Sequence, residues 1–172
     1  MHLLLLTGQR LREVAGMTWA EVDIDAALWT IPPERMKGDA AHEVPLAAAS
    51  VAILKGLPRW SGPFVFSNTG GSQPISGFSK LKEKVDSALP GIAPWRFHDL
   101  RRTMRTGLGG LPVPSNVAEL CIGHAQPGLH KVYDRHGYRD EKRHAFEAWA
   151  NRVMAIVDPG DASNVISIAA RG

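Results

Sequence analysis

Four side chains suited to phosphate chemistry lie within residues 96–138. His98 and Arg101 are three residues apart, so on a helix both project from the same face. A guanidinium and a titratable imidazole directed at one point are suited to binding a phosphate whose reaction requires proton transfer. His124 follows a glycine that can end a helix, and Tyr133 lies nine residues further on. Together these residues predict a phosphoryl-transfer site that needs no metal.

Other residues of the same types have simpler explanations. Tyr138 is the only other tyrosine, and the spacing from His124 favours Tyr133 as the nucleophile, with Tyr138 in a packing role. Asp99 is interpreted as a charge at a helix N-terminus rather than a catalytic acid. His42 is interpreted as a strand residue. Three further histidines are expected on the surface, facing solvent or a bound partner: His130, His136 and His144.

Positive charge is concentrated in the middle of the chain. The 172 residues carry a net charge of +3, and residues 80–105 hold seven Lys/Arg against three Asp/Glu. A basic block next to a phosphate-shaped site predicts a nucleic-acid partner. The DNA-binding candidates in this block, apart from Arg101, are Lys80, Lys82, Lys84, Arg96, Arg102 and Arg105.

Composition excludes several classes of protein. Cys121 is the only cysteine, so the chain has neither an intrachain disulfide nor a cysteine-based zinc site. The longest apolar run, residues 3–6, is far too short to cross a membrane and lacks the flanks of a signal peptide. The chain is therefore expected in the cytoplasm. It contains no P-loop and no carboxylate cluster that could hold magnesium.

The N-terminal third predicts two helices and a hairpin. Residues 2–6 are typical of the last turn of a buried helix, and Thr7-Gly8 breaks it before a second helix over residues 9–17. Arg10 falls in the first turn of the second helix. It forms an ordinary salt bridge with Glu13 three residues on, or is oriented by it. Residues 27–46 form a predicted β-hairpin, with Lys37 at its turn.

The rest of the chain is predicted to be mainly helical. Helices are expected at residues 47–57, 76–89 with Ser76 as cap, 98–108, 115–123 with Ser115 as cap, around Tyr133, and 140–156. The last helix has Phe146, Trp149, Val153 and Ile156 on an expected core face. Residues 64–67 are expected to form a short strand. The fold class is α+β, mostly α-helical with a small antiparallel sheet.

Five motifs in this order resemble those of the tyrosine recombinases, most closely the phage-type integrases. They are TGQRLREV, a lysine on a β-turn, FHDLRRT, CIGH and VYDRHGY. The resemblance covers residues 3–157 and implies the catalytic-domain fold of enzymes that break and rejoin DNA, truncated at its N-terminus. Residue by residue, it implies a catalytic set of Arg10, Lys37, His98, Arg101, His124 and Tyr133.

The resemblance also implies a mechanism and partners. Transesterification through a 3′-phosphotyrosyl link would need no cofactor and no metal. Double-stranded DNA would be the substrate of a homotetramer assembled on it from free monomers. Two alternatives stay open: nicking and closing like a type IB topoisomerase, and a non-catalytic DNA-binding remnant. The catalytic domain is expected at residues 1–157 and a tail at 158–172, in which residues 165–168 either pair with the sheet edge, in cis or in trans, or are disordered.

Overall fold

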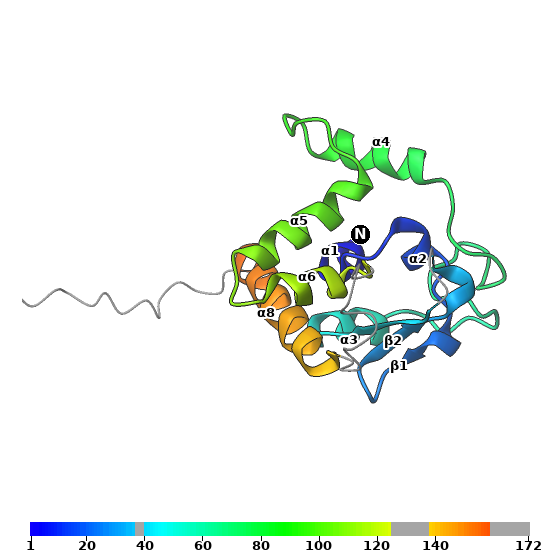
Figure 1. Ribbon diagram of the computed structural model, residues 1–172. Coiled ribbons are helices and arrows are strands. Elements are labelled where there is room, and N and C mark those ends of the chain that lie inside the picture. Colours follow the sequence, from blue (N-terminus) through cyan, green and yellow to red (C-terminus); the bar gives the residue numbers. More distant parts are fainter. Residues whose placement is uncertain (37–39, 125–137, 159–172) are drawn as a thin grey trace, which may run out of the picture.

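A computed structural model describes residues 1–36, 40–124 and 138–158 (Figure 1). In this part of the chain, helices cover one face of a small sheet. The α-helices are α1 (His2–Thr7), α2 (Leu11–Ala15), α3 (Ala48–Lys55), α4 (Phe78–Ala88), α5 (Phe97–Gly109), α6 (Ser115–Cys121) and α8 (Arg139–Val157). Two 3-10 helices, η1 (Trp19–Glu21) and η2 (Pro33–Arg35), flank the strands β1 (Val22–Asp23), β2 (Leu28–Ile31) and β3 (His42–Pro45).

The sheet confirms the predicted hairpin and adds one strand to it. All three strands are antiparallel in the order β1-β2-β3, with Trp29 opposite Val44 and Ile31 opposite His42. Trp29 and Ile31 alternate with less buried residues and are fully buried themselves, as expected for a sheet with one face against the core. β1 spans only two residues, which is too short for its sequence pattern to be recognised.

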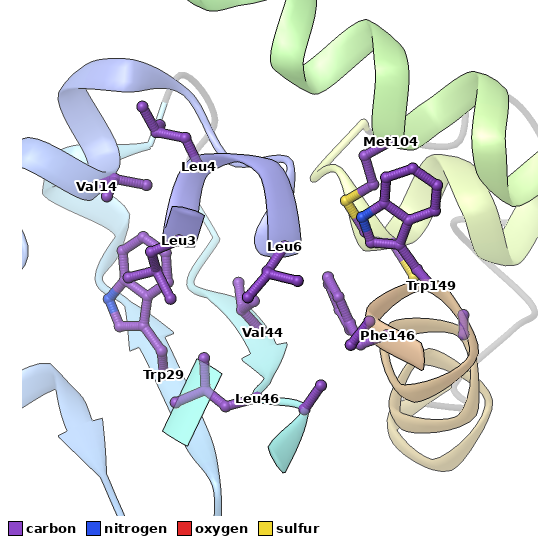
Figure 2. Packing of buried hydrophobic residues seen from close by; sticks show 14 of the residues in the cluster. Leu3, Leu4, Leu6, Val14, Trp29, Val44, Leu46, Met104, Phe146 and Trp149 are labelled. Carbon is purple, nitrogen blue, oxygen red and sulfur yellow. The ribbon is translucent and has the colours of Figure 1, made fainter. Parts of the chain in front are cut away.

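The centre of the core is the short helix α1. Leu3, Leu4 and Leu6 are buried. Figure 2 shows Leu3 beside Trp29, Leu6 between Val44 and Phe146, and Leu4 on the other side of α1, near Val14. Gly8 ends α1 with φ +61°, as the predicted Thr7-Gly8 break requires. α5, α8 and α3 all pack on α1, so the residues after Gly8 start from a fixed position.

α8 follows the predicted core face except at its end. Phe146, Trp149 and Val153 are buried, but Ile156 is 72% exposed, so its assignment to the core was wrong. Met154 and Val157 are exposed as well. The last turn of α8 therefore extends beyond the elements that cover Phe146 and Trp149.

Two predicted helix caps and one strand were also wrong. α4 begins after Gly77, which has φ +79°, and Pro114 occupies the cap position of α6, so neither Ser76 nor Ser115 caps a helix. Residues 64–67 form no regular strand. Phe64 makes one isolated bridge with Thr18, and the chain bends at Val65 and Phe66, within the segment itself.

α4 projects from the body of the molecule (Figure 1). None of its residues is buried, and Leu81 on its apolar face is 37% exposed. Its first ring, Phe78, packs edge-on against Phe97 with centroids 6.2 Å apart. Across the described ranges, no helix is both long and apolar enough to cross a membrane.

Candidate active site

Arg101 is the most constrained cation of the candidate site. It lies in α5 and is 5% exposed. Its Nη1 donates to the carbonyl of Gly8 at 2.8 Å and its Nη2 to the carbonyl of Ile122 at 2.5 Å. These two carbonyls belong to the ends of α1 and α6, so one side chain joins three helices. Within the described residues, Arg101 has no carboxylate in an ion pair.

Arg10 brings a second guanidinium to the same region. Its backbone is extended and precedes α2, so Arg10 is the cap residue and not part of the first turn as predicted. The Arg10 N–H donates to Glu13 at 2.7 Å, and its Nη1 donates to the other Glu13 oxygen at 2.6 Å. Glu13 is itself buried. The pair is therefore more than a surface salt bridge: Glu13 both caps the helix and orients the arginine.

The two arginines affect one another electrostatically. Burial, followed by the positive charge of Arg10, lowers the pKa of Arg101 to about 10, while Glu13 and Glu119 oppose the shift. Arg101 remains charged at neutral pH. Two cations brought close together, one of them buried, are unfavourable without an anion between them, and this arrangement is suited to a phosphate.

His98 differs from Arg101 although both lie in α5. Its side chain is exposed in the first turn, whereas Arg101 is buried one turn later. Asp99 beside it accepts the N–H of Arg96 at 2.7 Å, and this hydrogen bond lowers the pKa of Asp99. The interpretation of Asp99 as a helix N-terminal charge is thus confirmed.

His124 lies just beyond α6. Gly123 has φ +68°, and the N–H of His124 donates to the carbonyl of Glu119 at 3.1 Å. The imidazole Nδ1 lies 2.5 Å from a Glu119 carboxylate oxygen. No role was predicted for Glu119, although its position five residues before His124, across a glycine, was the signal that could have identified it.

His42 is the second residue whose role was missed. It lies on β3, 8% exposed, and a Cβ added to Gly123 would come within 3.2 Å of its ring. Burial, and next the charge of Lys142, lower the pKa of His42 to about 4. Lys142 is also buried and donates to the carbonyl of Glu43 at 2.8 Å. A neutral His42 therefore packs beneath the turn that carries His124, and it is more than a strand residue.

Of the remaining predicted residues, only some lie in the part of the chain that the structure describes. Lys37 and Tyr133 lie outside the described residues, as do His130, His136 and all of the tail after Asp158. Tyr138 precedes α8 with φ +48° and packs against the core, which suits a packing role. Among the described residues, no three His, Cys, Asp or Glu side chains gather as a metal site would require.

The DNA-binding candidates fall into two groups. Lys82, Arg102 and Arg105 form ion pairs, with Asp86, Asp99 and Glu119 respectively. Lys80, Lys84 and Arg96 are exposed, as is Arg102 of the first group.

A family comparison decides what these residues belong to. The model of the phage integrase family matches residues 1–139, most of the chain. The chain belongs to the phage integrase family. Prophage integrase IntA of Escherichia coli (strain K12) is 32% identical over 155 residues, 88% of this chain and 37% of that protein. Prophage integrase IntZ of the same strain is 29% identical over 91% of this chain and 39% of its own length. The chain thus spans about two fifths of the length of these relatives.

Solved structures confirm the fold of this phage integrase chain. The integrase from mycobacterium phage Brujita matches with a TM-score of 0.62 at 22% identity, over 84% of this chain and 49% of that one. XerA recombinase matches with a TM-score of 0.58 at 16% identity, over 91% and 56%. The predicted resemblance to tyrosine recombinases and the α+β class are therefore both confirmed.

Proposed function

We propose that this chain carries the catalytic site of a tyrosine-type, site-specific DNA recombinase. In this reaction a DNA strand is cut and later rejoined through a 3′-phosphotyrosyl link to Tyr133. The supporting observation is the pair of arginines, in which a buried Arg101 held by two backbone carbonyls is affected by the charge of Arg10. A phosphodiester is an anion that a pair of guanidinium groups can bind on its non-bridging oxygens.

Cleavage needs a nucleophile, a leaving group and proton transfers. The Tyr133 oxygen attacks phosphorus, and the bond from phosphorus to the 5′-oxygen breaks. His98 accepts the phenol proton, and Lys37 donates a proton to the departing 5′-oxygen. The tyrosyl ester keeps the energy of the broken bond, so a second 5′-hydroxyl can reverse the attack without ATP.

The described residues supply stabilisation of the transition state. Negative charge grows on the non-bridging oxygens as the new bond forms. Arg10 and Arg101 offset that charge, and His124 donates a hydrogen bond to the same oxygens. Because Glu13 and the two carbonyls hold the arginines in place before DNA arrives, little reorganisation is needed during the reaction.

The substrate we propose is double-stranded DNA, cut by a homotetramer that assembles on it from free monomers in the cytoplasm. A structure of the Tn1549 transposon integrase, in complex with transposon right end DNA, matches this chain with a TM-score of 0.53. Residues 1–157 would form the catalytic domain, and residues 165–168 of the tail would pair with the edge of the small sheet, in cis or in trans. The reaction would need no cofactor and no metal.

A suicide substrate tests the proposal. A nick placed so that the 5′-hydroxyl diffuses away should trap the covalent protein–DNA complex, visible on a denaturing gel. Tyr133→Phe should abolish this complex and leave DNA binding nearly intact, because only the attacking oxygen is lost. Tyr138→Phe is the matched control and should retain the complex.

Four outcomes would contradict the proposal. A covalent link that survives Tyr133→Phe would contradict the nucleophile. A strict magnesium requirement would contradict the metal-free mechanism, since EDTA should have no effect. Relaxation of supercoiled DNA at a single site of any sequence would favour a type IB topoisomerase. DNA binding without any covalent complex would favour a DNA-binding remnant.

A further inference from the structure

The end of α6 forms a two-bond turn that brings Glu119 next to His124. The N–H of Gly123 donates to the carbonyl of Leu120 at 3.0 Å, and the N–H of His124 donates to that of Glu119 at 3.1 Å. With Gly123 at φ +68°, this pair of bonds is a Schellman motif. The motif places the side chain of its last residue over the helix residue five positions earlier. In many proteins that contact is apolar, whereas here a carboxylate meets an imidazole.

Glu119 is held on its other side by α5. Arg105 Nε lies 2.7 Å from Oε1 of Glu119, while His124 Nδ1 lies 2.5 Å from Oε2. Arg105 also donates to the Ser115 hydroxyl at 3.1 Å, at the start of α6. Partial burial opposes ionisation of Glu119, but the hydrogen bonds from Arg105 and His124 prevail, and its pKa is lowered. The carboxylate is therefore ionised at neutral pH, with each oxygen engaged.

An ionised carboxylate determines which imidazole nitrogen carries a proton. A carboxylate only accepts, so Nδ1 of His124 must be the donor in this contact. That leaves Nε2, on the opposite edge of the ring, as the nitrogen that can meet a phosphate oxygen. In the form of the ring that carries both protons, Nδ1–H faces Glu119 and Nε2–H is free to donate to that oxygen.

We propose that Glu119, supported by Arg105, is a positioning residue that fixes the Nδ1–H form of His124 and presents Nε2 to the scissile phosphate. The effect of Glu119 on catalysis rests on the function proposed above, whereas its effect on the tautomer of His124 does not. Arg105 thereby acquires a role inside the protein in place of the DNA contact expected from its charge.

The first test is made on the chain without DNA. Nitrogen-15 NMR of the labelled imidazole, at a pH near 8 where a histidine ring is ordinarily neutral, distinguishes the two tautomers. The unmodified chain should show a proton on Nδ1 of His124. Glu119→Ala should shift the balance to the Nε2–H form, and Glu119→Gln, which keeps an oxygen acceptor, should restore part of the Nδ1–H form. Asp86→Ala removes a carboxylate from another ion pair, with Lys82 on α4, and should leave His124 unchanged.

The second test measures cleavage and DNA affinity separately. With the suicide substrate, Glu119→Ala should slow covalent-complex formation by up to roughly 100-fold, since outright loss of a transition-state hydrogen-bond donor costs about 100-fold or more. DNA affinity should change little, and Glu119→Gln should recover part of the rate. If Glu119 only stabilised the fold, Glu119→Ala would change neither the His124 tautomer nor the ratio of cleavage rate to DNA affinity.

The outcomes separate this inference from the proposed function. An unchanged His124 tautomer in Glu119→Ala, or cleavage as fast as in the unmodified chain, would overturn the inference. If the unmodified chain forms no covalent complex at all, the proposed function fails, and the NMR result alone then decides whether Glu119 positions His124.

Discussion

Arg101 lies buried between two backbone carbonyls, whereas Lys80 and Lys84 lie on α4, a helix in which no residue is buried. Hydrogen bonds to the two carbonyls hold the charged guanidinium of Arg101 in one position. The surroundings of the lysines allow their charges to move with their flexible stems. A cation that stabilises the transition state of phosphoryl transfer must be held in one position, as Arg101 is. A cation that only attracts the DNA backbone can remain on a flexible side chain, as in Lys80 and Lys84.

The arrangement of carboxylates follows the same division. Glu13 and Glu119 each orient a side chain of the candidate site through short contacts from a helix terminus. On α4, Asp86 pairs with Lys82 at 2.6 Å on the exposed surface, where ion pairs of this kind contribute about 0–1 kcal/mol. The comparison predicts that substitutions around Arg101 change catalysis, and that substitutions on α4 change only affinity.

The largest effect is expected from Arg101→Ala, compared with its neighbour Arg102→Ala. Loss of the buried guanidinium should slow covalent-complex formation by about 100-fold or more. It should also lower the free energy of unfolding by about 1–3 kcal/mol for each carbonyl left unpaired. Arg102, whose side chain is 75% exposed, should give a much smaller change in both. Equal sensitivity of cleavage to the two substitutions would remove the distinction between the regions.

The next effect concerns acid stability at His42. Because burial holds the pKa of His42 at about 4, below its ordinary 6.5, the unfolded chain binds the proton more tightly. His42 therefore contributes its full stabilisation above pH 6.5, and this is lost as the pH falls from about 6.5 to about 4. Complete loss would lower the free energy of unfolding by about 3 kcal/mol.

Urea unfolding at a series of pH values would measure this loss. His42→Gln cannot titrate and should show a flatter profile between pH 6.5 and 5, above the range in which carboxylates protonate. His144→Gln, at an exposed position, is the control and should keep the original slope. The same slope in His42→Gln would mean that another group is responsible.

A smaller and more local effect is expected at the glycines. Gly123→Ala and Gly91→Ala both place a side chain at positive φ, at +68° and +91°, for a backbone cost of about 1–2 kcal/mol. At Gly123 the new Cβ would also lie 3.2 Å from the buried His42 ring, whereas at Gly91 nothing lies within 4 Å. Thermal unfolding should therefore show the larger loss for Gly123→Ala, and only this variant should slow cleavage, because it displaces His124.

The smallest effect is expected on α4. The double variant Lys80→Ala, Lys84→Ala should weaken DNA binding modestly and lower the slope of log affinity against log salt by about one for each phosphate that is no longer neutralised. Unfolding free energy should stay within about 0.5 kcal/mol. Lys55→Ala, an exposed lysine at the end of α3, should leave the salt slope unchanged. If Lys55→Ala reduces the salt slope as much as the double variant does, α4 makes no special contribution to DNA binding.

Local patterns in the sequence were enough to predict much of this fold. The hairpin, the break at Gly8 and the core face of α8 up to Val153 all follow from short-range alternation, turn residues or helical spacing. Ser76 failed as a cap because Gly77 takes that position. Ile156 failed because helical spacing shows which face is apolar but not where the neighbouring elements end.

Residue types and spacing suggested a candidate site, but they did not indicate the environment of its side chains. The three-residue spacing of His98 and Arg101 suggested a shared face, yet one is exposed and the other is buried against α1 and α6. His42 becomes important only because β3 brings its ring next to Gly123, a tertiary contact about which periodicity along one strand carries no information. Glu119 meets His124 through the local turn at Gly123, which the five-residue spacing across a glycine could have indicated.

The two carbonyls that hold Arg101 also determine when the site can form during folding. Gly8 is 93 positions away in the chain and Ile122 is 21 positions away, so the chain must close a long loop before the guanidinium is held on both sides. Contacts across such distances tend to form late, because the entropy of loop closure is lost before they contribute. A chain whose C-terminal helices have not yet docked on α1 has no assembled anion site. The anion site proposed at Arg101 is therefore among the last parts of the molecule to form.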